Sequence, residues 1–310
     1  MHNKLIGIVG PTGTGKSKLA IKLAQANNGE IISCDSRQVY RYMDIGTAKL
    51  TVNERALVPH HLIDIINPDE DLSLAQYQEL AYQAIYTIQK KENIPLLVGG
   101  TGQYFQAVVE GWQIPRVKPD IEYRKSLEKR AANGEAAELH HELVEIDPES
   151  GKKIDPRNIR RVIRALEVYK SRGIPFSKLQ RKSAPPYRTL IIGLYTERQE
   201  LYRRVDSRVD EMVKLGLIEE VKKLIEMGYG TDLPAMSGIG YRQIGDFLKG
   251  NLSLPEAVQQ MKYETHRYIR QQYLWFRLKD DRIDWFNINS DMENDCCNLI
   301  NDFLNSGEPD

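Results

Sequence analysis

A glycine-rich segment near the N-terminus of this 310-residue chain carries the residues best suited to chemistry. It consists of Gly10, Pro11, Thr12, Gly13, Thr14, Gly15, Lys16 and Ser17. This is the spacing of a phosphate-binding loop, in which glycines let successive backbone N–H groups converge on an anion. Lys16 would reach the terminal phosphates, and the Ser17 hydroxyl would bind Mg²⁺. The segment therefore predicts a site for a diphosphate-like ligand.

Two further polar segments follow apolar runs. Asp35 follows residues 29–34, and Thr101 lies in the glycine-rich segment after Ile94–Val98. Asp35 could bind Mg²⁺, act as a general base, or be an ordinary loop acid. Thr101 stands where a phosphate-loop NTPase usually has a second acidic Mg²⁺ ligand. The lack of an acid at this position argues against an ATPase or a GTPase. It could bond a phosphate or a reacting amine, or merely cap a turn.

Arginines at helical spacing form a third candidate site. They are Arg157, Arg160, Arg161 and Arg164. Residues at this spacing share one face of a helix, where four positive charges repel one another unless anions lie against them. The phosphates of a nucleic acid would neutralise this row. Ion pairs with Glu138, Glu142 and Glu145 on a solvated face would do so equally well.

A second, smaller set of arginines lies later in the chain. Arg204 and Arg208 are one helical turn apart. Their guanidinium groups could close over a diphosphate opposite the phosphate-binding loop. Pairing with Asp206 and Asp210 on the surface is the simpler interpretation, and the local sequence alone favours it.

The elements that must position these residues alternate between strands and helices. The predicted strands cover residues 5–9, 29–34, 94–98, 189–195 and 283–286. Residues 74–92 have the apolar spacing of a helix. Such alternation predicts an α/β fold with a P-loop NTPase-like core, which is a parallel sheet flanked by helices. The carboxyl ends of parallel strands meet at one edge, so the phosphate-binding loop, Asp35 and Thr101 should converge on one site.

The pattern changes between about residues 113 and 187. Prolines there punctuate charged, helical segments that contain no convincing strand. We therefore predict an all-helical insertion domain over residues 113–187. It divides the P-loop core into residues 1–112 and residues 188–310, and the second part ends in helices.

Composition restricts the possible classes of function. The formal net charge is zero, so a nucleic-acid partner would have to be recognised by a local basic surface. The cysteines are Cys34, Cys296 and Cys297, a sparse set that fits a reduced cytosolic protein without disulfides or zinc. No apolar run approaches the roughly 20 residues that a membrane span needs. The expectation is a soluble, cytoplasmic protein.

In combination, these motifs closely resemble the bacterial tRNA dimethylallyltransferases. The matching segments are Gly10–Ser17, Asp35–Tyr40, Asp44–Lys49, His60–Asp64, Gly99–Gly102, Arg161–Val168, Arg204–Arg208 and Gly238–Arg242. The resemblance runs from about residue 4 to about residue 280. It implies transfer of a dimethylallyl group from dimethylallyl diphosphate to N6 of the adenosine 3′ of the anticodon in tRNA, with release of diphosphate. The partner would then be the anticodon stem-loop of tRNA, with Mg²⁺ as cofactor at the phosphate-binding loop. No membrane is expected, and nothing in the sequence demands more than a monomer.

The resemblance further implies roles for individual residues. Asp35 would be the base for N6, and Thr101 would position N6 or the bridging phosphate oxygen. The groups expected to stabilise the leaving diphosphate are Lys16, Arg204, Arg208 and Mg²⁺ on Ser17. The residues expected to contact tRNA are Asp35, Ser36, Arg37, Gln38, Thr101, Tyr123, Arg157, Arg160, Arg161, Arg164 and Arg242. Arg160 departs from the family, because bacterial relatives often carry glutamine there.

Three alternatives share parts of this pattern. An adenylate isopentenyltransferase would add the same group to AMP, ADP or ATP and would not need a basic helical insertion. A phosphate-loop kinase of a small metabolite would use the same loop, although no acid follows Val98. A non-catalytic RNA-binding module would have no use for the intact pair of Lys16 and Ser17.

Overall fold

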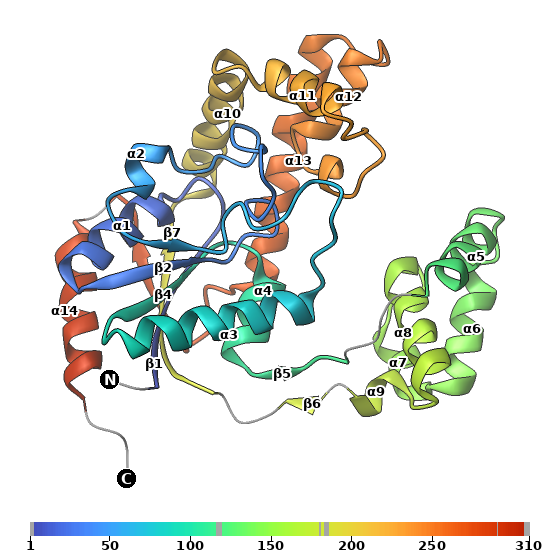
Figure 1. Cartoon of the computed structure of the whole chain (residues 1–310), viewed down its shortest axis with the longest axis horizontal. Helices are drawn as coiled ribbons and strands as arrows, with labels where there is room; N and C mark the ends of the chain where they lie inside the picture. Colours follow the sequence, from blue (N-terminus) through green and yellow to red (C-terminus); the bar gives the residue numbers. More distant parts are fainter. Residues whose placement is uncertain (1–2, 116–119, 180, 183–185, 290, 307–310) are drawn as a thin grey trace. The chain divides into compact units, whose positions relative to one another are not determined.

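The computed structural model describes residues 3–115, 120–179, 181–182, 186–289 and 291–306 (Figure 1). The chain divides into two compact units. One unit comprises residues 1–109 together with residues 185–310, and the other comprises residues 110–184. Each unit has its own hydrophobic core.

The first unit is built on a six-stranded sheet in which every pair of neighbouring strands is parallel. Its strands are β1 (Lys4–Val9), β2 (Gly29–Ser33), β3 (His60–His61), β4 (Ile94–Val98), β7 (Arg188–Tyr195) and β8 (Ile283–Asn287). Their order across the sheet is β3-β2-β4-β1-β7-β8. The central strand β1 pairs with β4 and β7, which places Ile6 opposite Leu96 and Leu190. The predicted parallel sheet is therefore confirmed.

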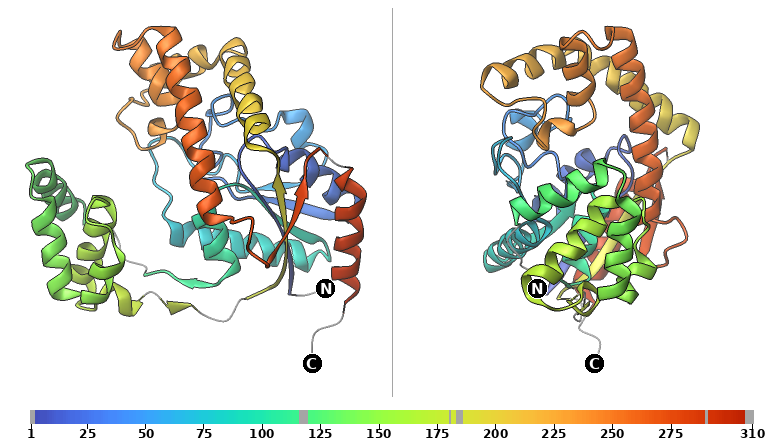
Figure 2. Two further views of the ribbon diagram at one scale, coloured as in Figure 1. Left: turned by 180° about the vertical axis from the view of Figure 1, so that it is seen from behind. Right: turned by 90° about the vertical axis from the view of Figure 1, so that its right-hand side faces the viewer.

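Alternate residues of β1 face two separate halves of the core, as the period of a strand requires. Leu5 and Val9 pack with α3 (Leu74–Lys90) and α4 (Gly102–Val109). Ile6 and Ile8 pack with α1 (Lys16–Ala26) and α14 (Met292–Asn305). Helices therefore cover both faces of the sheet (Figure 2). Strands such as β1 and β4 are buried on both sides, so their sequences are continuous apolar runs, and this pattern predicted them.

Five further helices of this unit form a third cluster around the loop that follows β2. They are α10 (Arg198–Lys214), α11 (Leu217–Glu226), the 3₁₀ helix η1 (Ala235–Ser237), α12 (Tyr241–Leu248) and α13 (Leu254–Trp275). The short helix α2 (Val52–Arg55) buries none of its residues. Val39, Tyr40 and Met43 from the loop are buried against α11 and α12. The stretch from residue 43 to residue 64, which carries no long element, is thereby fixed to the core.

The second unit is a small helical domain. Its helices are α5 (Ile121–Ala132), α6 (Ala136–Ile146), α7 (Pro148–Lys153), α8 (Ile159–Arg172) and α9 (Phe176–Leu179). They enclose an apolar core that includes Leu127, Leu143 and Leu166. The prediction that this region contains no strand is wrong in one respect, because β5 (Trp112–Gln113) and β6 (Arg181–Lys182) form an antiparallel pair. Two residues are too few to produce a strand periodicity in a sequence.

Glu220 on α11 connects the loop that follows β2 to α11 and α12. Its carboxylate accepts the backbone N–H groups of Asp44, Ile45 and Gly46 at 3.0, 2.8 and 3.2 Å. The Tyr241 hydroxyl donates to the same carboxylate at 2.6 Å. Four donors therefore converge on one side chain, and they would lose their partner together if it were removed.

We predict that Glu220→Ala lowers the free energy of unfolding by about 2–3 kcal/mol, because the donors it leaves behind are only partly reached by water. Urea denaturation measures this change. Glu219→Ala is the matched control, since Glu219 is exposed on the same helix and its loss should change stability by less than about 0.5 kcal/mol. Equal effects of the two substitutions would contradict the prediction.

Candidate active site

The phosphate-binding loop lies between β1 and α1, at the carboxyl edge of the sheet. Gly13 and Gly15 have φ angles of 87° and 83°, in the region that side chains disfavour. A Cβ on Gly13 would also lie 2.7 Å from the Val205 side chain, so α10 packs directly on the loop. The Thr14 hydroxyl and the Lys16 ammonium both donate to the Pro11 carbonyl, at 2.9 and 2.8 Å. The loop is thus held in one shape by backbone and side-chain contacts.

Asp35 and Thr101 lie together at the same edge. The Thr101 N–H donates to the Cys34 carbonyl at 3.2 Å, and the Thr101 hydroxyl oxygen accepts the Ser36 N–H at 3.0 Å. Asp35 Oδ1 accepts the N–H groups of Arg37 and Gln38 at 2.8 and 3.3 Å. Within the described residues, the second oxygen, Oδ2, accepts no hydrogen bond. The carboxylate is therefore fixed in orientation while one oxygen stays free to accept a proton.

Lys16, Asp35 and Arg208 are close enough to influence one another electrostatically. Burial lowers the pKa of Lys16 to about 8; Asp35 opposes this shift, and Arg208 adds to it. Burial likewise lowers the pKa of Arg208, with Asp35 again opposing the shift. Two partly buried cations therefore lie near one carboxylate, which leaves a net positive site suited to an anion.

Arg204 does not share this environment. Its Nε donates to Glu200 at 2.7 Å, and its NH2 group lies 3.4 Å from the Asn289 side-chain oxygen. Arg208, one turn later, instead donates to the Ala48 carbonyl at 3.4 Å. Of the two arginines expected at the diphosphate, the structure brings only Arg208 beside Lys16 and Asp35.

Three side chains expected to contact RNA are engaged with the protein itself. Arg37 donates to the Pro234 and Ala235 carbonyls at 3.0 and 3.2 Å. Gln38 donates to the Thr47 carbonyl at 3.2 Å. Arg242 lies 3.4 Å from Glu264, with about half of its side chain exposed (51%). Each would have to exchange these partners to bind RNA.

The row of arginines in the helical unit differs in part from its prediction. Helix α8 begins at Ile159, so Arg157 precedes the helix and pairs with Asp155 at 2.7 Å. The Asn158 side chain caps the helix by accepting the Arg161 N–H, which excludes residue 157 from the helical face. Arg164 donates to the Pro115 carbonyl at 3.4 Å and lies 3.7 Å from Glu167.

Arg160 and Arg161 are exposed, and their side chains have no ionic or hydrogen-bonding partner among the described residues. Two of the three glutamates considered as their partners are engaged elsewhere: Glu142 pairs with Arg130 at 2.6 Å, and Glu145 lies 3.4 Å from His141. Glu138 pairs with neither Arg160 nor Arg161 in the described part of the chain. Tyr123 carries the Lys170 ammonium over its ring at 3.8 Å. Two free guanidinium groups thus remain at the start of α8.

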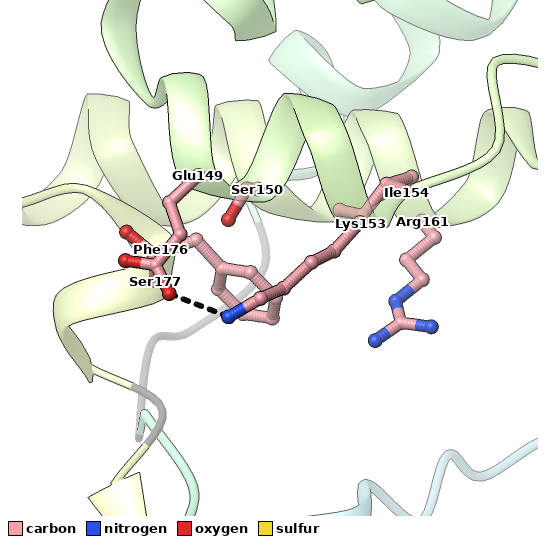
Figure 3. Close-up of a pocket in the computed structure, with 7 residues that line it drawn as sticks. All are labelled: Glu149, Ser150, Lys153, Ile154, Arg161, Phe176 and Ser177. Atoms are coloured by element: carbon pink, nitrogen blue, oxygen red, sulfur yellow. Dashed lines mark hydrogen bonds and ion pairs between the residues drawn. The ribbon is translucent and has the colours of Figure 1, made fainter.

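Arg161 also borders a small pocket of about 80 Å³ in the helical unit (Figure 3). The pocket is lined by Glu149, Ser150, Lys153, Ile154, Arg161, Phe176 and Ser177. Lys153 pairs with Glu149 across it, while the Arg161 guanidinium points away from that pair. The pocket is therefore polar, with one cation still available to a ligand.

The paired histidines of β3 make structural contacts. His61 bonds Glu30 at 2.6 Å, and His60 Nδ1 bonds the Val58 carbonyl at 2.8 Å. No cluster of three or more His, Cys, Asp or Glu side chains suited to a metal occurs in the described part of the chain. Ser17, Ser33 and Gln38 line a small cavity together with His60 and the apolar residues Ile31, Leu50, Ile63 and Val98.

Sequence reasoning missed Gln272 on α13. Its side chain is almost fully buried (2% exposed), and it connects the phosphate-binding loop to the loop after β4. Its spacing in the sequence could have indicated this burial. Gln272 falls three residues after Ile269 and four before Phe276, so it lies on the apolar, buried face of the helix.

These features define a class of protein: an α/β fold with a P-loop-like core whose phosphate-binding loop faces a carboxylate and a threonine. The IPP transferase family model matches residues 38–279, and the isopentenyl transferase model matches residues 3–64. The chain belongs to the IPP transferase family.

Individual relatives agree with this assignment. A tRNA dimethylallyltransferase of Dehalococcoides mccartyi is 51% identical, over 98% of this chain and 93% of that protein. The crystal structure of a tRNA isopentenylpyrophosphate transferase from Bacillus halodurans is similar, with 43% identity, a TM-score of 0.71, and coverage of 97% of this chain and 95% of that one. A eukaryotic dimethylallyltransferase acting on tRNA has 28% identity and a TM-score of 0.84, over 97% of this chain and 79% of that one. None of the helices in the described residues is long and apolar enough to cross a membrane.

The buried charge of Lys16 leads to a prediction about stability. Below about pH 8 the folded protein carries this ammonium at a desolvation cost. Between about pH 8 and pH 10.5 the unfolded chain holds a proton that the folded chain has lost, so stability rises with pH in that window. We expect Lys16→Met to be more stable than wild type by about 1 kcal/mol at pH 7, and the difference to shrink towards pH 10.

Urea denaturation of both proteins at pH 7 and at pH 9.5 measures this difference. Lys18→Met is the control, because Lys18 is exposed on the same helix and should show no such pH dependence. A Lys16→Met protein that is less stable than wild type at pH 7 would show that the ammonium stabilises the fold instead.

Proposed function

We propose that the protein is a tRNA dimethylallyltransferase. It moves a dimethylallyl group from dimethylallyl diphosphate to N6 of the adenosine 3′ of the anticodon and releases diphosphate. The observation that carries the proposal is that Asp35 lies near Lys16, while the Thr101 hydroxyl bonds the N–H of Ser36 next to Asp35. Thr101 lies after β4, where a phosphate-loop NTPase would need a second acid. The names of the relatives that match nearly the whole chain support the same activity.

The reaction forms a bond between N6 and C1 of the dimethylallyl group and breaks the bond from C1 to the bridging oxygen. The electron pair of that bond leaves with diphosphate, and the N6 proton passes to Asp35. Negative charge grows on the leaving oxygens, where Lys16, Arg208 and the loop N–H groups stabilise it. Arg204 would join them by exchanging its bond to Glu200. Thr101, fixed by Ser36, positions the reacting groups.

The residues present fit Mg²⁺ bound together with a diphosphate. Mg²⁺ prefers oxygen ligands and usually binds through one or two protein groups plus substrate phosphates. Ser17, at the start of α1, would be its protein ligand. When bound, the ion would neutralise part of the charge on the diphosphate.

The helical unit would bind the anticodon stem-loop through its free arginines. Arg160 and Arg161 need no exchange of partner to contact phosphates, whereas Arg157 and Arg164 would compete with Asp155 and Glu167. Tyr123, covered by Lys170, adds an aromatic group. Ser36, Arg37, Gln38 and Arg242 would contact the target base and its neighbours.

We place this activity in the cytoplasm, where tRNA is used. A single copy carries both the phosphate-binding loop and the arginine-bearing unit, so one chain supplies every predicted contact and the protein would act as a monomer. One alternative is favoured by a specific observation: the isopentenyl transferase model matches residues 3–64, which include the phosphate-binding loop and Asp35. An adenylate isopentenyltransferase would share these residues and would not need the arginine-bearing helical unit.

A competition experiment separates the two activities. Isotope-labelled dimethylallyl diphosphate and Mg²⁺ are mixed with the protein, unmodified tRNA and AMP in one tube, and the labelled nucleosides are identified by mass spectrometry. We expect label on N6 of the adenosine beside the anticodon. Label on AMP would assign the protein to the small-molecule class, and label on neither would favour a kinase.

The role of Asp35 is tested by Asp35→Asn, which retains the oxygen that accepts the N–H groups of Arg37 and Gln38. Only the base is lost, so kcat should fall by about 10²- to 10⁴-fold while the Kd for tRNA stays unchanged. Single-turnover kinetics and filter binding measure the two quantities. Asp69→Asn, at an exposed loop acid, is the control. Equal losses of kcat and of tRNA affinity would overturn the base assignment.

A further inference from the structure

Helix α13 places three side chains of one face against the loop that follows β4. Tyr268, Gln272 and Trp275 stand at the i, i+4 and i+7 positions of that helix. The Tyr268 hydroxyl lies near Thr101, and burial together with nearby Asp35 raises its pKa. A Cβ on Gly102 would lie 2.2 Å from the Trp275 ring, so the ring rests directly on the backbone there. The loop that carries Thr101 is therefore shaped by this helix.

Gln272 reaches both loops of the site at once. Its Oε1 accepts the Thr12 N–H of the phosphate-binding loop at 2.9 Å, and its Nε2 donates to the Gly100 carbonyl at 3.0 Å. One partner is a donor and the other an acceptor, so both ends of the amide are satisfied in one orientation. A Cβ on Gly100 would lie 2.2 Å from Nε2, so any larger residue there would displace the Gln272 amide.

The bond to Gly100 fixes the peptide that precedes Thr101. Gln272 bonds the carbonyl of that peptide, and the Cys34 carbonyl accepts its N–H at 3.2 Å. A peptide plane bonded at both ends cannot rotate, so the direction of the Thr101 side chain is set. The Thr101 hydroxyl in turn bonds the N–H of Ser36, next to Asp35. A chain of contacts thus runs from Thr12 through Gln272 to the two groups that face the acceptor.

We infer that Gln272 is a positioning residue, which fixes the distance between the diphosphate on the phosphate-binding loop and the acceptor amine at Asp35 and Thr101. This rests on the proposed function. Group transfer depends on the alignment of the attacking nitrogen, C1 and the leaving oxygen, and a displacement of about 1 Å can cost about 100-fold in rate. The side chain touches neither reactant and acts through Thr12 and Gly100.

Two substitutions at Gln272 test this role. Gln272→Met has similar volume and no charge but loses both hydrogen bonds, and kcat should fall by about 10- to 100-fold, with a smaller change in the Kd for inorganic diphosphate. Gln272→Glu keeps an acceptor for Thr12 and turns a carboxylate towards the Gly100 carbonyl, so its kcat should fall at pH 8. Protonation of the new carboxyl would restore a donor to the Gly100 carbonyl. The ratio of the variant's kcat to that of wild type should therefore be higher near pH 6 than at pH 8.

The matched controls are Gln271→Met and Gln271→Glu, because Gln271 is the exposed neighbour on the same helix and should tolerate both changes. Thermal melting of every variant shows whether it is folded at the assay temperature. Wild-type kcat in both Gln272 variants would overturn the proposal, and so would a loss of kcat in Gln272→Glu that pH does not change. If wild type itself transfers no label to tRNA, the proposed function fails instead, and the two failures are thereby distinguished.

Discussion

Two cations near one carboxylate constrain the rest of the site. Lys16 and Arg208 are both partly buried and lie close enough to Asp35 to interact with it electrostatically, and loss of hydration disfavours the charge on each of them. Such an arrangement is unfavourable until an anion arrives, so the surrounding structure must prevent the two side chains from moving apart. The packing of Val205 on Gly13 does this, since it fixes α10, and with it Arg208, against the phosphate-binding loop.

The loops at the carboxyl edge are therefore fixed by side chains that come from distant helices. Gln272 joins the phosphate-binding loop to the loop after β4, and Glu220 binds three successive N–H groups of the loop after β2. Lys49 adds a further anchor, because its nearly buried ammonium bonds Asp44 and Asp64 at 2.8 and 2.5 Å. Long irregular loops can keep a defined shape only when their backbone groups are satisfied in this way.

Features that depend on neighbouring residues in the sequence were predictable, and features that depend on distant contacts were not. The strand, loop and helix around Lys16 follow from local apolar runs and glycines. Arg157 was assigned to a helical face by spacing alone, but the Asn158 cap starts the helix after it. The partners of Arg37, on η1 about 200 residues later, leave no trace in the local pattern. The role of Gln272 likewise depends on a contact that spans 260 residues.

The end of β4 explains how a phosphate-binding loop can serve a reaction other than phosphoryl transfer. An NTPase needs an acid there to complete the Mg²⁺ site around a transferring phosphoryl group. In this chain the same position begins with Gly99, whose Cβ would lie 2.0 Å from the Cys34 carbonyl oxygen, so no acidic side chain fits. The close approach brings the backbone of Thr101 against that of Cys34 and places the threonine hydroxyl beside Ser36. The chain therefore has a threonine hydroxyl near this position in place of a charged metal ligand. The proposed reaction would not require such a ligand, because the bond would break at carbon and the diphosphate would only have to leave.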